Sequence, residues 1–290
     1  MKPYAVLTDS TCDLPQEMAD SHGIDIINFK IAVDGNGYTE RVDFSPEQFC
    51  EMLRNAKSVP TTAQITSFEF LDRFEEYDRL GVKDVLYVSI NATGSGTHAQ
   101  AHQAAKQFKN EHPESGMRIF IVDSHAYSIA QGYPVIEAAE MLDLGRSMEE
   151  VVSFLEDKYA RMEILLVAYT LKVIRKSGRV SAAAAIAGEL LGIHPIFTLN
   201  DGVSRVIRKI RGEKAAATVM AQTMKSRMVP GKPYFVMVTD KRYMDEYKKV
   251  CEQVIGYPPA GIHILGAAVQ SNTGPEAVGM VYEGAKRERD

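Results

Sequence analysis

The feature that most constrains the fold is a regular alternation of short β-branched runs with helical patterns in the first half of the chain. Residues 4–7, 85–88 and 119–122 are apolar runs of strand length, and each is followed by a polar loop. Strands that alternate with helices usually form a parallel sheet, because each crossover helix returns the chain to the same end of the sheet. The sequence therefore predicts an α/β fold whose N-terminal, largely parallel sheet is flanked by helices.

Beyond about residue 160 the pattern favours a mixed sheet. Asn200-Asp201-Gly202 separates two strand-like runs and is typical of a tight β-hairpin. The expected strands are 163–168, 195–198, 203–207, 234–238 and 262–267, and the expected helices are 143–162, 181–191 and 243–255. The sequence therefore predicts two domains: an N-terminal α/β domain at 1–160 with the anion-binding loops, and a smaller, mixed-sheet α/β domain at 161–290.

Three polar loops are expected to meet at one edge of the N-terminal sheet. They span residues 8–13, 89–97 and 123–128, and each follows a predicted strand. Ligands of parallel α/β sheets bind beyond the carboxyl ends of the strands. These loops are therefore the expected place for a ligand.

The middle loop has the composition of an anion site. Gly94, Ser95, Gly96 and Thr97 come directly before a predicted helix. Glycines allow the backbone to approach a ligand, hydroxyls donate hydrogen bonds, and a helix N-terminus favours negative charge. A carboxylate or a phosphate is the expected ligand. Because Ala99 completes a spacing close to the dinucleotide fingerprint, a dinucleotide remains an alternative.

Composition and missing motifs argue against several other classes. The chain has 33 Lys and Arg against 38 Asp and Glu, a net charge of −5, which does not suit a general nucleic-acid binder. Cys12, Cys50 and Cys251 are too widely spaced for a disulfide framework or a zinc site. His98 and His102 share a helix face but lack an evident third ligand, so no metal is expected. The chain has no P-loop, no signal peptide and no run of about 20 apolar residues, so a cytoplasmic location is expected.

Six stretches across the chain carry an ordered set of motifs. They are TDSTCDLP at 8–15, TAQIT at 62–66, NATGSGT at 91–97, VDSHAYS at 122–128, KSGRVS at 176–181 and SNTGP at 271–275. Together they resemble the DegV family, which includes the fatty-acid carrier subunits of bacterial fatty acid kinase. Ala92, Asn272 and Glu276 depart from that family's pattern, which has a serine, a histidine and a glycine at these positions.

The resemblance implies a lipid carrier with its ligand between two domains. The fatty-acid carboxylate would be held by hydroxyls of two loops, here Thr62 and Ser95, and the acyl tail would enter an apolar tunnel. The full set of implied ligand-binding residues is Thr61, Thr62, Gly94, Ser95, Gly96, Thr97 and Asn272. The resemblance implies a non-catalytic subunit with no catalytic residue, cofactor or metal, whose ligand is a long-chain fatty acid.

The implied partner is the ATP-binding subunit of a fatty acid kinase, which would phosphorylate the bound carboxylate to an acyl phosphate. Residues 172–211 hold 8 basic and 2 acidic residues, so their net charge is 8 − 2 = +6. Such a segment suits an acidic partner or a phosphate. Arg175, Lys176 and Arg179 are therefore the expected docking residues. No nucleic acid and only transient membrane contact are expected.

Two other functions remain open from the sequence. A stand-alone phosphoryl-transfer enzyme would use the same anion loop, with His98, His102 or His125 as the phosphoryl acceptor. The absence of a P-loop and of a clear Mg²⁺ carboxylate cluster argues against it. A regulatory module that binds another anionic metabolite would share the site with a carrier and differ only in its partner.

Overall fold

The computed structural model describes residues 2–184 and 192–288, and the chain divides into two compact units. The first unit is formed by Met1–Lys30 and Ala63–Tyr159, and the second by Ile31–Thr62 and Ala160–Asp290. The break near residue 160 lies where the sequence places it. Residues 31–62, however, belong to the second unit, which is therefore the larger of the two.

Contacts of helix α2 explain why residues 31–62 join the second unit. The α2 helix, Pro46–Asn55, packs against α11, Ala267–Thr273. The side-chain amide of Gln270 donates to the Pro46 carbonyl at 2.9 Å, and the Ala268 amide donates to Glu40 at 2.8 Å. These partners lie more than 200 positions away in the sequence, so no local pattern could reveal them.

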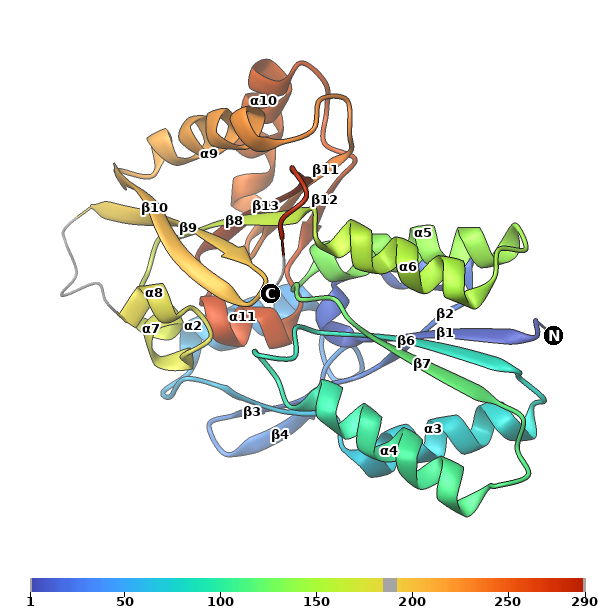
Figure 1. Cartoon of the computed structure of the whole chain (residues 1–290). Coiled ribbons are helices and arrows are strands. Elements are labelled where there is room, and N and C mark those ends of the chain that lie inside the picture. The colour runs from blue at the N-terminus through green and yellow to red at the C-terminus, as the bar shows by residue number, and fades with distance from the viewer. Residues whose placement is uncertain (1, 185–191, 289–290) are drawn as a thin grey trace. The chain divides into compact units, whose positions relative to one another are not determined.

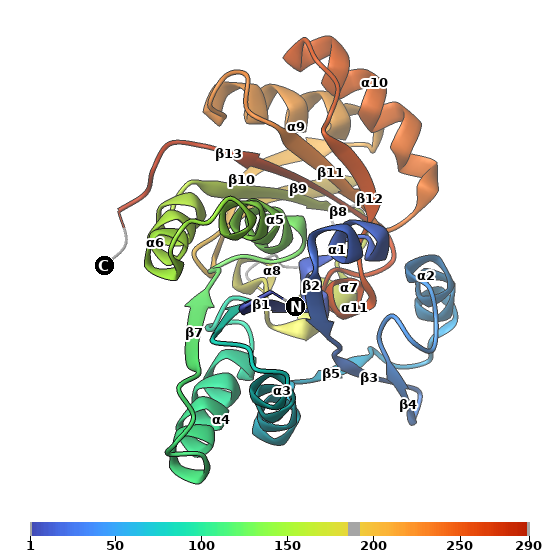
Figure 2. The same ribbon diagram turned by 90° about the vertical axis from the view of Figure 1, so that its right-hand side faces the viewer.

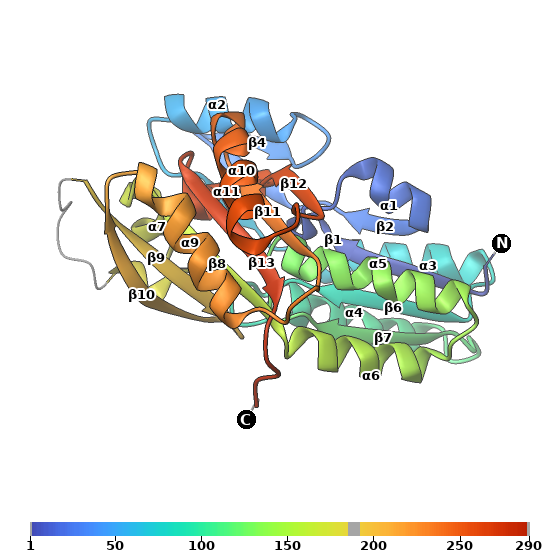
Figure 3. The same ribbon diagram turned by 90° about the horizontal axis from the view of Figure 1, so that it is seen from above.

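The first unit is a four-stranded parallel sheet covered on both faces by helices. The sheet order is β2-β1-β6-β7 and every pairing is parallel, as predicted. Figure 1 shows α5 and α6 over one face and α3 and α4 over the other, and Figure 3 shows α5 and α6 side by side. The elements are β1 (Tyr4–Asp9), η1 (Ser10–Cys12), α1 (Gln16–His22), β2 (Ile24–Ile27), α3 (Ser67–Arg79), β6 (Asp84–Ser89), α4 (Thr97–Glu111), β7 (Arg118–Asp123), α5 (Ile129–Asp143) and α6 (Met148–Tyr159).

The second unit contains a six-stranded mixed sheet and a small three-stranded sheet. The large sheet has the order β10-β9-β8-β13-β11-β12, in which only β11 and β12 pair in parallel, and the small sheet has the order β4-β3-β5. The further elements are β3 (Lys30–Val33), β4 (Asn36–Thr39), β5 (Thr61–Ala63), β8 (Met162–Ala168), α7 (Lys172–Ser177), α8 (described over Ser181–Ala184), β9 (Ile193–Asn200), β10 (Val203–Arg211), α9 (Lys214–Arg227), β11 (Tyr234–Val238), η2 (Lys241–Tyr243), α10 (Met244–Ile255), β12 (Gly261–Ile264) and β13 (Ala277–Glu283).

Two apolar clusters pack on the large sheet of the second unit. Met220 and Tyr247 belong to the cluster beneath α9 and α10, and Ile174 and Phe197 belong to the cluster on the side of α7. The strand β13 is buried along its whole length because it lies between β8 and β11. The sequence does not predict β13, since a strand buried on both faces lacks the alternation of apolar and polar residues.

Three expected elements differ from the structure. The helix expected over 143–162 is interrupted, because α5 ends at Asp143 and α6 begins at Met148. The strand expected over 262–267 stops at Ile264, and Gly266 caps α11 instead. Of the helix expected over 181–191, residues 185–191 lie outside the described residues. None of the described helices is both long enough and apolar enough to span a bilayer.

Candidate functional site

The three polar loops meet at the carboxyl ends of β1, β6 and β7, as predicted. The Ile90 amide after β6 donates to the Asp9 carboxylate at the end of β1, with an N···Oδ2 distance of 2.8 Å. The Ala92 amide donates to Asp123 at the end of β7 at 3.1 Å, and the Asn91 amide donates to the Ala126 carbonyl at 3.1 Å. Backbone-to-carboxylate contacts therefore hold the loops in one fixed arrangement.

Asp9 is the centre of this arrangement. Its side chain is fully buried, at 0% exposure. It accepts hydrogen bonds from the Tyr87 hydroxyl at 3.0 Å, from the Thr11 amide at 3.2 Å and from the Thr11 hydroxyl. Burial raises the pKa of the Asp9 carboxyl, although these hydrogen bonds oppose the rise. The TDST motif thus organises the site from behind.

The hydroxyl of Ser95 is directed away from the protein's own acceptors. The Thr97 hydroxyl oxygen accepts from the Ile65 amide at 3.3 Å and lies 2.9 Å from the Ser95 oxygen. Thr97 is fully buried, so its own hydroxyl proton needs an acceptor, and Ser95 is the neighbour that offers one. Ser95 also accepts from the Thr97 amide at 3.3 Å. With both lone pairs engaged, Ser95 has its own proton left to donate to a ligand.

Two glycines in this loop are required by side chains that press against them. A Cβ on Gly96 would lie 2.0 Å from the Gln64 Oε1 atom, and a Cβ on Gly94 would lie 2.4 Å from the Tyr127 hydroxyl. Sequence reasoning assigned these glycines to ligand approach and missed Gln64 and Tyr127. Both missed residues lie inside motif stretches, at 62–66 and 122–128, which was the available signal.

The N-terminus of α4 adds positive potential to the same place. The helix begins at Thr97 after Gly96, and no described side chain caps it. The first amides of a helix have no partner within the helix, and its aligned dipoles favour an anion at this end. The half-buried Ser95 hydroxyl and this helix end together suit a carboxylate.

The contacts of Asp123 argue against the dinucleotide alternative. Its carboxylate accepts from the Ala92 amide and, at 2.8 Å, from the His125 amide. The His125 ring nitrogen Nδ1 lies 3.3 Å from the same carboxylate. These contacts occupy Asp123 with its own loop, whereas a dinucleotide site needs a carboxylate that accepts from the ribose.

The histidines of α4 form a chain of side-chain contacts. The His98 Nδ1 atom lies 2.8 Å from the Ser89 hydroxyl, and its Nε2 atom lies 3.1 Å from Nε2 of His102. Burial lowers the pKa of His98, as do the charges of His102 and His125, while Asp123 acts in the opposite direction. A lowered pKa keeps the His98 imidazole neutral near pH 7.

Thr61, Thr62 and Asn272 lie in the second unit. Thr61 and Thr62 belong to β5, which pairs with β3. The Asn272 side-chain amide donates to the Ala268 carbonyl within α11 at 2.8 Å. Glu276, whose charge could oppose an anionic ligand, is paired with Arg242 at 2.8 Å. Contact of Thr61, Thr62 and Asn272 with a ligand stays a prediction.

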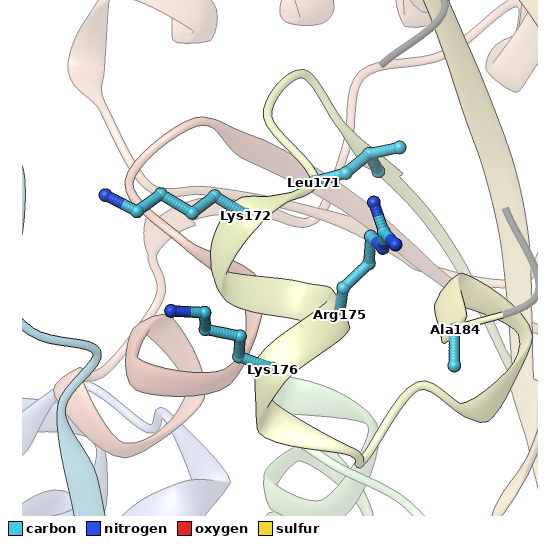
Figure 4. Close-up of a pocket in the computed structure, with 5 residues that line it drawn as sticks. All are labelled: Leu171, Lys172, Arg175, Lys176 and Ala184. Carbon is cyan, nitrogen blue, oxygen red and sulfur yellow. The ribbon is translucent and has the colours of Figure 1, made fainter. Parts of the chain in front are cut away.

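The predicted docking residues border a basic cavity at α7. A cavity of about 470 Å³ is lined by Leu171, Lys172, Arg175, Lys176 and Ala184. Figure 4 shows Lys172 and Lys176 extending in one direction from α7 and Arg175 in another. Within residues 2–184 and 192–288, none of the three cations forms an ion pair. Arg179 lies just beyond, where its guanidinium donates to the Ser177 carbonyl at 2.9 Å.

Comparison with known proteins gives a consistent result along the whole chain. A family model described as "Uncharacterised protein, DegV family" matches residues 3–285. A DegV domain-containing protein of Caldanaerobacter subterraneus is 30% identical over 287 residues, covering 98% of this chain and 99% of the relative. A DegV domain-containing protein of Clostridium perfringens is 28% identical over 294 residues, covering 99% of this chain and 100% of the relative.

Solved structures match the fold over the same length. A DegV family protein from Thermus thermophilus, described by its fatty-acid binding, has a TM-score of 0.85 and 26% identity, covering 98% of this chain and 100% of that protein. A DegV lipid-binding protein from Thermotoga maritima has a TM-score of 0.82 and 25% identity, covering 99% of this chain and 100% of that protein. The α/β fold with one parallel and one mixed sheet is thus that of these proteins.

Proposed function

This chain belongs to the DegV family, and we propose that it is a non-catalytic carrier that binds a long-chain fatty acid and presents it to a kinase partner. Two solved relatives at 25–26% identity are described by fatty-acid or lipid binding. The observation that carries the proposal for this chain is the outward Ser95 hydroxyl beside the uncapped N-terminus of α4.

The head group is assigned to the loop of the first unit. A carboxylate removed from water is tolerated only when hydrogen bonds replace its hydration. Ser95 supplies a hydroxyl donor, and Gly94, Gly96 and Thr97 shape the loop that precedes α4. Thr61, Thr62 and Asn272 complete the proposed set. Burial of the acyl tail adds roughly 0.8 kcal/mol for each methylene group.

Mass spectrometry of the organic extract of the protein, purified from a bacterial host, tests the binding function. We expect about one long-chain fatty acid for each chain, because burial of an alkyl chain and pairing of its carboxylate make release slow. The mass gives the chain length and saturation. Protein that is empty as purified and takes up no added fatty acid would contradict the carrier function.

The kinase partner is proposed to dock on the basic face of α7. Arg175, Lys176 and Arg179 are exposed on or just after this helix, and complementary charge directs the encounter of two proteins. The expected partner is the ATP-binding subunit of a fatty acid kinase, which would supply the ATP chemistry. The purified chain alone is therefore expected to leave ATP unchanged.

Charge reversal separates docking from lipid binding. In the double variant Arg175→Glu, Arg179→Glu, phosphorylation of bound fatty acid by the kinase subunit should fall roughly tenfold or more, with fatty-acid affinity unchanged. Lys248→Glu, Lys249→Glu on α10 changes the net charge equally at two other exposed lysines and serves as the control. Equal loss of binding and phosphorylation, or an equal effect of the control, would count against docking at α7.

A further inference from the structure

Three metal-ligating side chains meet at the far ends of α3 and α4 in the first unit. Glu75 lies in α3, Glu111 is the last residue of α4, and His112 follows it. One ligand atom from each lies within 4.8 Å of the other two. The His112 Nε2 atom is 3.1 Å from the Glu75 Oε1 atom. Two carboxylates and an imidazole from two helices thus converge on one point.

The imidazole of His112 is held in position by its neighbours. Its ring stacks on Phe108, with ring centroids 4.8 Å apart and an interplanar angle of 24°. Its backbone amide donates to the Phe108 carbonyl at 2.9 Å. Because these contacts use the face of the ring and the backbone, the Nε2 edge stays directed at Glu75.

The charge of the cluster favours a cation. Among the residues that the structure describes, neither Glu75 nor Glu111 has a Lys or Arg nitrogen within 4.0 Å. Glu111 accepts at Oε1 from the Gln107 side-chain amide at 3.0 Å, so its Oε2 atom remains for another partner. The C-terminus of α4 adds the negative end of the helix dipole. A neutral imidazole would leave the two carboxylates uncompensated.

We propose that Glu75, Glu111 and His112 bind one Zn²⁺ ion, with water completing its coordination. Mixed nitrogen and oxygen ligands suit zinc, whereas Mg²⁺ and Ca²⁺ prefer oxygen ligands alone. The ion joins α3 to the end of α4. Both helices begin at the ligand loops, where the Ser67 amide donates to the Gln100 side chain at 3.0 Å, and Figure 2 shows them side by side. The site is therefore a structural clamp on the pair of helices, apart from the fatty-acid head group.

Calorimetric titration of the chelator-stripped full chain with Zn²⁺ tests this site. We expect one ion for each chain, and His112→Gln and Glu75→Gln should each weaken binding by roughly tenfold or more, since loss of even an outer partner of a ligand costs that much. Glu114→Gln removes one negative charge two residues beyond His112 and should leave the affinity unchanged. A loss with Glu114→Gln equal to that with Glu75→Gln would overturn the site, because it would show attraction by surface charge alone.

Two further measurements keep the site distinct from its rivals. His102→Ala breaks the other close histidine pair, whose Nε2 atoms are 3.1 Å apart, and should not change Zn²⁺ binding. Loss of binding in His102→Ala with retention in His112→Gln would refute the assignment. A large excess of Mg²⁺ should fail to displace Zn²⁺, and full displacement would contradict an imidazole ligand. The melting temperature should rise with Zn²⁺ in the unmodified chain and not in His112→Gln.

Discussion

Replacing Ser95 with alanine should weaken fatty-acid binding by roughly 10- to 150-fold, because a hydrogen bond to a charged group contributes about 1.5–3 kcal/mol. The Ser95 oxygen receives the Thr97 amide and lies beside the Thr97 hydroxyl, so its own proton points outward. Alanine removes that proton and leaves the carboxylate with one donor fewer. Displacement of a fluorescent fatty acid from lipid-stripped protein measures the change directly.

A second hydroxyl in the same loop provides the control for Ser95. The Thr93 hydroxyl donates to the Asn91 side chain at 3.1 Å, so it is already engaged within the protein. Thr93→Ala should therefore keep the affinity of the unmodified chain, with a similar melting temperature in both variants. Unchanged affinity in Ser95→Ala would remove this hydroxyl from the head-group site. An equal loss in both variants would indicate a general disturbance of the loop.

The elements that periodicity could predict are those stabilised by local patterns. Alternation of strands and helices predicts the parallel sheet of β1, β6 and β7, and the turn at residues 200–202 predicts the pairing of β9 with β10. The membership of residues 31–62 could not be predicted, since it depends on contacts such as that of Pro46 with Gln270. Such contacts join residues far apart in the sequence and leave no periodic signal.

The candidate site divides in the same way. The glycines and hydroxyls of residues 94–97 form one short stretch, and the chemistry of an anion site can be recognised from it. The side chain that makes Gly96 necessary, Gln64, comes from another loop, and its role requires the fold. Glu75 and His112 likewise meet only because α3 packs on α4, so the sequence alone predicts no metal site.

Asp9→Ala should be the most destabilising of the substitutions considered, by about 3–5 kcal/mol, because it leaves several buried donors without an acceptor. The Ile90 amide and the Tyr87 hydroxyl, which bond to Oδ2, would lose their partner, as would the Thr11 amide at Oδ1. The melting temperature of the first unit should fall by roughly 10–15 °C. Asp9→Asn keeps one acceptor oxygen but places a donor beside the Thr11 amide or the Ile90 amide, so an intermediate loss is expected. Differential scanning calorimetry resolves the order.

Asp34 is the matched control for Asp9, since it makes a similar number of hydrogen bonds at an exposed position. Its carboxylate accepts from the Lys57 and Ser58 amides at 3.0 Å each and from the Ser58 hydroxyl at 2.9 Å. Water can replace an exposed acceptor, so Asp34→Ala should lower the melting temperature far less than Asp9→Ala. Equal shifts would show that burial does not set the cost. If so, the Asp9 carboxylate would not be what holds the ligand loops together, and fatty-acid affinity should survive its removal.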